Sequence, residues 1–273
     1  LHLVTHPDYD IPLAEGHRFP ASKFTRLIRH LEDDGVLAKF TNVKPAPASV
    51  TALSRIHDPH YVASINDGTI SKEALRVLGF EWSEALARRS FLAPNGTLMT
   101  ARLALEHGLA CHAAGGTHHA HYGHGAGFCV FNDIAFTAIN LLRDPGIGQV
   151  LILDCDVHQG DGTARMLSHE DRAITVSLHC ATNYPVRKAN SDFDVELERG
   201  LNNDGYLAIL ANTLSKLARD IKPDIAIYDA GVDIHIDDRL GYLEITDNGL
   251  RARDDMVLGH FLSRNIPVAT VIG

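Results

Sequence analysis

The sequence predicts a single α/β domain built on a parallel sheet, and three observations carry this prediction. Short runs rich in aliphatic residues, typical of strands buried on both faces, alternate along the chain with helical patterns of apolar residues. The 273 residues contain no Pro/Ser-rich linker and no internal repeat, which favours one domain over residues 1–273. A hydrophobic content of 45% is ordinary for a globular protein with a substantial core.

The elements follow from the spacing of apolar residues. Strands are expected where aliphatic residues run together, at residues 1–5, 109–114, 149–153, 173–178, 225–228 and 268–272. Helices are expected where apolar residues recur every three to four positions, at residues 22–31, 133–142, 206–221 and 246–263. Between residues 40 and 95 the strand signal fades, and we expect helices and loops punctuated by Pro45, Pro47, Pro59 and Pro94.

Composition excludes several classes of protein. The formal net charge of −9 and the absence of a Lys/Arg cluster argue against direct nucleic-acid binding, while a cationic substrate would be attracted. No apolar stretch is long enough to span a membrane, and no signal peptide opens the sequence as given. Cys111, Cys129, Cys155 and Cys180 are scattered rather than spaced as a disulfide framework. We therefore expect reduced thiols and a cytoplasmic protein.

The segment DCDVHQGDG, residues 154–162, places acids and an imidazole directly after an expected strand. In open α/β sheets chemistry collects at the carboxyl ends of strands. Alternate residues of an extended backbone share a face, so Asp156 and His158 can point at one cation such as zinc. The alternative is a polar turn in which Asp161 caps the following helix.

A glycine-rich segment, GGTHHAHYGHGAGFCVFND at residues 115–133, contains the adjacent histidines His118 and His119. Glycines let a backbone bend tightly and approach a ligand. In amide hydrolysis one histidine of such a pair can accept a proton from water while the other protonates the leaving amine. The alternative is a solvated histidine-rich loop, to which we assign His112, His121 and His124.

Asp233 supplies a third candidate ligand just beyond the expected strand at residues 225–228. It can meet Asp156 and His158 across adjacent loops. Three protein ligands leave a coordination position open, as a catalytic zinc site requires, although this donor set does not exclude iron(II). Asp229, Asp237 and Asp238 are interpreted more simply as turn or surface acids.

With these segments in view, the chain resembles the histone deacetylase family, and within it the class IV enzymes and their bacterial relatives. The resemblance spans nearly the whole sequence and rests on blocks in the family's order: GGTHH, GFCVFND, LDCDVHQGDG, VSLH, NYP and DAGVDIHIDDRLG. It implies the arginase/deacetylase fold, an eight-stranded parallel sheet flanked by helices on both faces. The active site would lie in loops at the carboxyl ends of the strands.

The resemblance also implies roles for individual residues. Asp156, His158 and Asp233 would bind the catalytic zinc. His118 and His119 would be the catalytic pair, with Asp154 and Asp161 orienting their rings.

Two further groups follow from the same resemblance. Gly127, Phe128 and Tyr184 match the walls of the family's acyl-lysine channel. The monovalent-cation site, with potassium expected, would use Asp154, Asp156, His158, Ser177 and Leu178.

One departure concerns the end of the sequence. Family members carry a tyrosine just after a glycine-rich strand end, and its hydroxyl polarises the scissile carbonyl. This sequence stops at ATVIG, residues 269–273, so we expect a portion of a longer protein that lacks the Gly-rich/Tyr segment. Loss of one such donor lowers a rate by about a hundredfold to a thousandfold.

The expected function is metal-assisted hydrolysis of an N-acylated amine, most simply an acyl-lysine peptide, by a zinc-activated water and the histidine pair. One alternative keeps the chemistry but takes an acetylpolyamine or another small amide. Another is a non-catalytic module that binds acyl-lysine. The sequence leaves the acyl length and the oligomeric state open.

Overall fold

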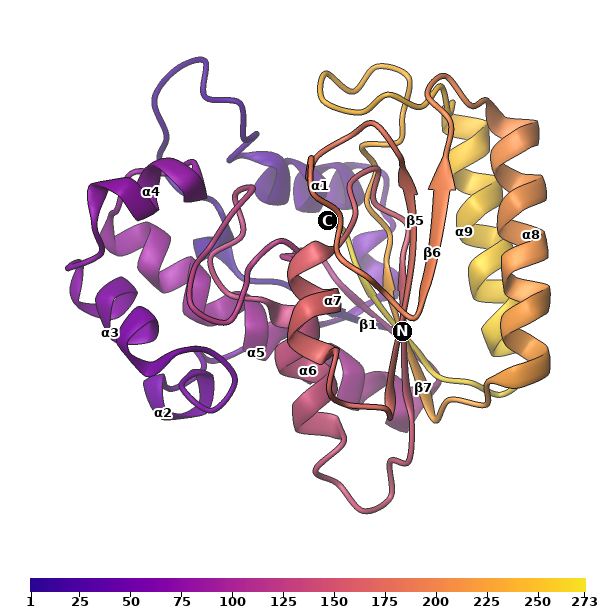
Figure 1. Cartoon of the computed structure of the whole chain (residues 1–273), viewed down its shortest axis with the longest axis horizontal. Coiled ribbons are helices and arrows are strands. Elements are labelled where there is room, and N and C mark those ends of the chain that lie inside the picture. The colour runs from indigo at the N-terminus through magenta and orange to yellow at the C-terminus, as the bar shows by residue number, and fades with distance from the viewer.

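Eight parallel strands form the central sheet in the computed structural model of the chain, which describes residues 1–273 (Figure 1). Across the sheet the strands lie in the order β2-β1-β3-β8-β7-β4-β5-β6. In chain order they are β1 (His2–Val4), β2 (Thr41–Val43), β3 (Leu109–His112), β4 (Val150–Asp154), β5 (Ala173–Cys180), β6 (Phe193–Leu197), β7 (Ile225–Asp229) and β8 (Val268–Val271). The expected α/β fold with an eight-stranded parallel sheet is confirmed.

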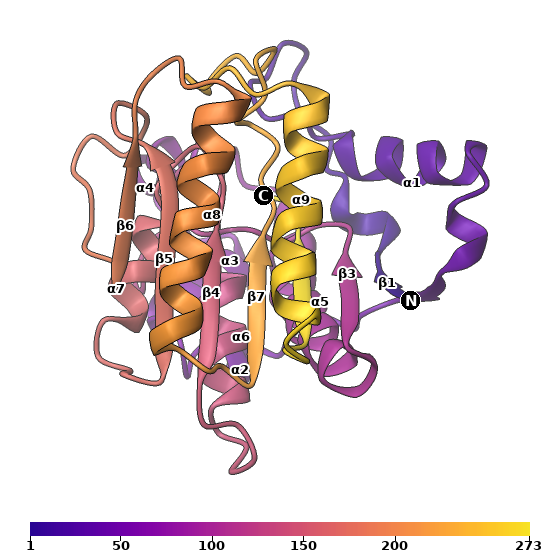
Figure 2. The ribbon, with the colours of Figure 1, turned by 90° about the vertical axis from the view of Figure 1, so that its right-hand side faces the viewer.

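Helices cover both faces of the sheet. They are α1 (Lys23–Asp33), α2 (Val50–Leu53), α3 (Pro59–Asp67), α4 (Lys72–Leu78), α5 (Glu84–His107), α6 (Asp133–Leu141), α7 (Asp161–Leu167), α8 (Asn203–Asp220) and α9 (Asp247–Leu262), with short 3₁₀ turns at Pro7–Tyr9 and Leu37–Lys39. Helices α8 and α9 pack on one face, and α5, α6 and α7 lie on the other (Figures 1 and 2). None of the helices combines the length and apolar content needed to cross a membrane.

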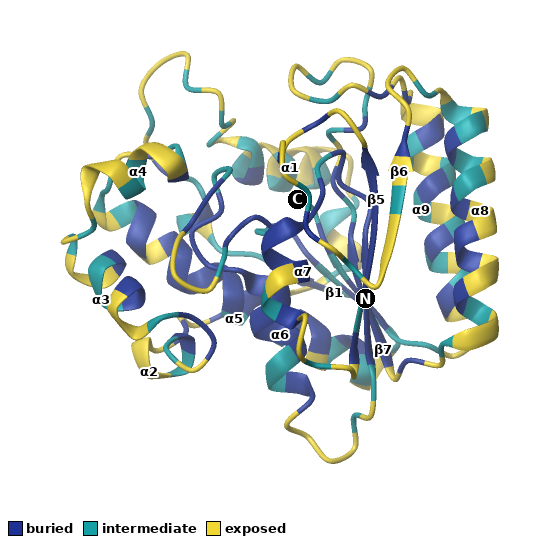
Figure 3. Cartoon of the chain, viewed as in Figure 1, coloured by how far each residue is buried: buried dark blue, intermediate teal, exposed yellow.

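Two large apolar clusters fill the space between the layers. One packs α5, α6 and the segment α2–α4 against the sheet, and the other packs α8 and α9 against its opposite face. Strands β4 and β7 are buried along their whole length, since helices cover both of their faces (Figure 3). This explains why the sequence identifies these two strands so clearly.

The elements that the sequence does not reveal have visible physical reasons. Strands β2 and β6 are the two edges of the sheet, and both are largely exposed, so they lack a continuous apolar run. Helix α7 has only seven residues, too few for a periodic pattern. Pro94, expected to punctuate loops, lies inside the 24-residue helix α5.

The parallel arrangement brings the carboxyl ends of the central strands together along one border of the sheet, here named the carboxyl edge. Asp154 at the end of β4 is in register with Asp229 of β7 on one side and with Ser177 of β5 on the other. The segments that follow β3, β4 and β7 therefore meet above the same part of the sheet. This edge is where the sequence places the candidate ligands and histidines.

Candidate metal centre and histidine pair

Asp156, His158 and Asp233 converge on one point at this edge. The imidazole Nδ1 of His158 lies 2.8 Å from a carboxylate oxygen of Asp233 and 3.0 Å from one of Asp156. One ligand atom from each of the three residues lies within 4.8 Å of the others. The three residues come from the segments after β4 and β7, as the sequence predicts.

Backbone amides hold both carboxylates in place. The N–H of His158 donates to Asp156 Oδ1 at 2.8 Å, and the N–H of Val157 donates to Asp233 Oδ1 at 2.8 Å. The second bond ties the β7 segment directly to the β4 segment. The carboxylates of Asp156 and Asp233 are therefore fixed by hydrogen bonds from the backbone.

The donor set fits a divalent transition metal. One imidazole nitrogen and two carboxylate oxygens suit zinc, and three protein ligands leave a position for water or substrate. Burial and the neighbouring Asp156 carboxylate raise the pKa of Asp233 to about 7, against the opposing effect of His158. A positive charge between two carboxylates held this close is favourable, and a cation bound by them would supply it.

Each histidine of the pair is held by its own carboxylate. His118 Nδ1 lies 2.8 Å from Asp154 Oδ2, and His119 Nδ1 lies 2.8 Å from Asp161 Oδ1. Because an ionised carboxylate only accepts hydrogen bonds, both Nδ1 atoms carry a proton. The Nε2 atoms are the free ones, and that of His118 lies 3.8 Å from Asp156.

The surroundings separate the two histidines electrostatically. Burial and the adjacent His118 lower the pKa of His119 to about 3, although Asp161 acts in the opposite direction. Burial also opposes a charge on His118, but Asp154, Asp156 and Asp229 outweigh it and hold the pKa of His118 well above its usual value. The surroundings thus favour a neutral His119 beside a cationic His118, and the two ring centroids lie 4.1 Å apart.

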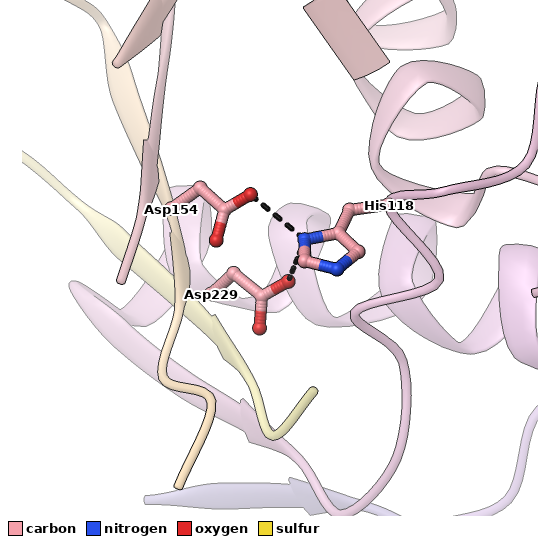
Figure 4. Close-up of side chains that lie close together, drawn as sticks. All are labelled: His118, Asp154 and Asp229. Carbon is pink, nitrogen blue, oxygen red and sulfur yellow. Dashed lines mark hydrogen bonds and ion pairs between the residues drawn. The ribbon is translucent and has the colours of Figure 1, made fainter. Parts of the chain in front are cut away.

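Asp229 is a buried neighbour of His118, so its interpretation as a turn or surface acid is wrong. Figure 4 shows Asp154 and Asp229 on the same side of the His118 ring, with Asp229 Oδ2 3.9 Å from Nδ1. Asp229 is fully buried, and neither of its oxygens has a hydrogen-bond partner. Burial, followed by Asp154, raises its pKa well above the usual value. Its position at the end of a strand, like that of Asp154, was the available signal.

Of the three expected channel residues, Tyr184 and Gly127 lie against His119. The rings of Tyr184 and His119 are perpendicular with centroids 4.8 Å apart. Gly127 has a φ of +53°, and an added Cβ would come within 2.6 Å of the His119 ring, so this position requires glycine. The ring of Phe128 packs instead into an aromatic cluster with His17, Phe19 and Phe80.

The residues matched to a monovalent-cation site also lie together. Ser177 and Leu178 are consecutive buried residues of β5, and Ser177 is in register with Asp154. The Ser177 hydroxyl lies 3.0 Å from His179 Nδ1, and its oxygen keeps a free lone pair.

The outcomes for four other residues differ from one another. His112 is wrong as a loop residue, because it is fully buried in β3. His121 is mostly buried, with Nε2 3.3 Å from Asp161 Oδ2, whereas His124 is exposed as expected. Asp161 is the first residue of α7 after the N-cap Gly160, so the alternative that makes it the cap is wrong.

Comparisons with known proteins find relatives over nearly the whole chain. A family model described as "Histone deacetylase domain" matches residues 17–273. An uncharacterized protein of Picosynechococcus sp. is 46% identical over 272 residues, 99% of this chain and 90% of that protein. Histone deacetylase 2 of Arabidopsis thaliana is 31% identical over 280 residues, 97% of this chain and 72% of that protein.

More distant matches extend the same picture. The acetoin utilization protein AcuC of Staphylococcus xylosus is 27% identical over 256 residues, 86% of this chain and 66% of that protein. Among solved structures, an HDAC homologue complexed with SAHA superposes with a TM-score of 0.86 at 22% identity, over 100% of this chain and 78% of that one. The HD domain of HDA15 gives a TM-score of 0.82 at 20% identity, over 100% and 82%. At these identities the structural matches speak for the fold.

Proposed function

This chain belongs to the histone deacetylase family and is a hydrolase of amide bonds, and from that premise we propose that it removes an acyl group from an acyl-lysine side chain. The observation that carries the proposal is the convergence of Asp156, His158 and Asp233 beside the His118/His119 pair. We propose zinc as the ion that these three residues hold, with iron(II) as the other candidate. Such an ion would supply Lewis-acid chemistry, polarising an acyl carbonyl and acidifying water.

His119 acts as the base in this proposal. Its Nδ1–H donates to Asp161, which fixes the ring and leaves Nε2 free to accept a proton from the attacking water. The neutral state needed for this step is supported by the lowered pKa of His119.

His118 acts as the acid. Its charge is supported by Asp154 and the neighbouring carboxylates, and it can donate a proton to the leaving amine. The products are a carboxylate and a free amine.

The substrate channel is proposed to run past Tyr184, Gly127 and Phe128. Tyr184 stands against His119 and is 43% exposed, so it joins the catalytic residues to the surface. A lysine side chain has the reach and the slender shape that a channel ending at a buried pair requires. The cluster of Asp154, Ser177 and Leu178, with backbone oxygens of Asp156 and His158, is proposed to bind potassium beneath the site.

The decisive experiment incubates the zinc-loaded protein with acetyl-lysine peptide, fatty-acyl-lysine peptide and acetylspermidine in competition, and follows each product by mass spectrometry. We expect release of free lysine peptide. Preferential turnover of acetylspermidine would assign the same chemistry to a small amide. Binding of the acyl peptides without any turnover in the metal-loaded protein would instead support a binding module and refute the hydrolase proposal.

A further inference from the structure

Gln159 follows His158 directly, and its side chain is bound to a distant segment. Its Nε2 donates to the carbonyl of Ala189 at 3.0 Å and to Asp194 Oδ1 at 2.7 Å. Its Oε1 accepts from the N–H of Ala189 at 2.7 Å. Only 1% of Gln159 is exposed, and its two bonds to Ala189 are shielded from water, whereas the bond to Asp194 is partly buried.

The segment it holds is the connection between β5 and β6, residues 181–192, here named the Tyr184 loop. Lys188 closes the loop on itself by donating to the carbonyls of Asn183 at 2.6 Å and Pro185 at 2.7 Å. Asn183 ties one end to the Leu240 carbonyl at 2.6 Å. At the tip Val186 is 96% exposed, whereas Pro185 and Ala189 are buried, so the polar contacts act together with local packing to hold the loop.

We propose that Gln159 is a positioning residue that holds the Tyr184 loop against the segment carrying His158. Through the loop it sets where the Tyr184 ring stands beside His119 and His158, whose ring centroids lie 4.8 and 6.4 Å from that of Tyr184. The width of the channel is thereby linked to the metal-binding segment by one amide side chain. The inference about the channel rests on the proposed function, whereas the inference about the loop does not.

Limited proteolysis of the native protein tests the loop directly. Arg187 is exposed in the loop and offers trypsin a cleavage site. Removing the three hydrogen bonds of Gln159 in Q159A is expected to raise the rate of cleavage after Arg187 about tenfold or more, since the loop opens more often. Q159E keeps the acceptor but places a carboxylate against Asp194, and is expected to raise the rate as well.

The matched controls are Q149A and Q149E. Gln149 precedes the central strand β4, at the amino ends of the strands and away from the carboxyl edge, and its side chain makes no hydrogen bond. These variants should be cleaved at the wild-type rate. Cleavage of Q159A and Q159E at that same rate would overturn the proposal.

Asp194 supplies a second variant that spares the buried position. It is exposed on the edge strand β6, so D194A is expected to fold even if the Gln159 variants do not. D194A should also accelerate cleavage after Arg187. Because Gln159 and Asp194 share one hydrogen bond, the rate increase in the double variant Q159A/D194A should be smaller than the product of the two single increases. A D194A protein as protected as wild type would contradict the clamp.

Kinetics then test the channel. With acetyl-lysine peptide, Q159A should raise KM about tenfold while changing kcat less, because a wall contact binds substrate and transition state alike. Equal loss of kcat and kcat/KM would overturn the positioning role. If the wild-type protein turns over no acyl-lysine, the proposed function fails, and the proteolysis result still decides the role of Gln159.

Discussion

At the scale of single residues, we predict that zinc binding depends on Asp233. Asp233→Ala removes one of the three proposed ligands and is expected to abolish turnover and to leave the purified protein with little bound zinc, as measured by elemental analysis. The matched control is Asp237→Ala, because Asp237 belongs to the same loop and its side chain is 89% exposed. Full zinc content in the Asp233 variant would exclude this residue as a ligand.

We predict that Asp161 sets the tautomer of His119. Asp161→Asn keeps the shape but allows the amide to donate, so His119 no longer needs a proton on Nδ1 and loses the free Nε2. We expect kcat to fall about tenfold to a hundredfold with unchanged zinc content. Asp171→Asn, an exposed acid beyond the end of α7, serves as control. A variant with wild-type kcat would show that the carboxylate is dispensable.

The residues that a sequence identifies at this site are those with a local signature. Asp156 and His158 alternate on one extended segment, and His118 and His119 are adjacent among glycines, so each pair is visible in a short stretch. Asp229 and Gln159 are not visible in this way. Asp229 has only its position at the end of a strand as a signal, and its contact with His118 follows from the register of β4 and β7. The role of Gln159 follows from its contacts with residues 181–192.

At the scale of elements, α9 supports the proposed metal centre through Arg253. This fully buried side chain donates from Nη1 to the Gly231 carbonyl at 2.5 Å and from Nη2 to the Ala230 carbonyl at 3.2 Å, two residues that precede Asp233. A helix packed on the face of the sheet thus fixes the segment that leads to Asp233. The planar fork of arginine suits two adjacent carbonyls, and the single ammonium of lysine does not.

Arg253→Lys is accordingly expected to weaken zinc binding about tenfold to a hundredfold, measured by competition with a chelating indicator. Arg251→Lys makes the same chemical change at an exposed position two residues away and should have no effect. Equal zinc affinity in both variants would show that Arg253 of α9 does not contribute to zinc binding.

Elements differ in how far the sequence predicts them, and burial explains the difference. The strands from 150 to 154 and from 225 to 229 are covered on both faces, so their aliphatic runs are unmistakable. Edge strand β6 has the sequence FDVEL, in which three of five residues are exposed, and it resembles a polar loop. Pro94 lies within α5 even though proline usually ends a helix, and only tertiary packing explains its place there.

At the scale of the whole molecule, buried neutral histidines make stability depend on pH. Burial lowers the pKa of His57 to about 4 and that of His112 to about 3. His57 Nε2 accepts from the N–H of Asn132 at 3.0 Å and Nδ1 faces the His121 carbonyl at 3.0 Å, so a second ring proton would break a bond. The unfolded chain, with ordinary histidines near 6.5, therefore binds more protons than the folded protein in mildly acidic solution.

The sign follows directly from this difference. These two groups contribute their full stability above pH 6.5, and the contribution is lost as the pH falls from 6.5 towards 4. From about pH 6.5 to about pH 5 the free energy of unfolding should fall by on the order of 1 to 2 kcal/mol for each group. Urea unfolding at the two pH values measures the loss. His60→Asn, at an exposed position, should leave the slope unchanged, whereas an unchanged slope in His57→Asn would refute the role of His57.

Since all eight strands run in the same direction, the carboxyl ends of the strands lie on one side of the molecule and the amino ends on the other. Every proposed ligand and both paired histidines sit on the first side, while turns such as residues 143–148, which leads into β4, occupy the second. That turn is mostly exposed and projects from the body (Figure 1). A short affinity peptide inserted there should leave melting temperature and turnover unchanged, making it a natural handle for surface immobilisation; a collapse of turnover would mean that the two sides communicate.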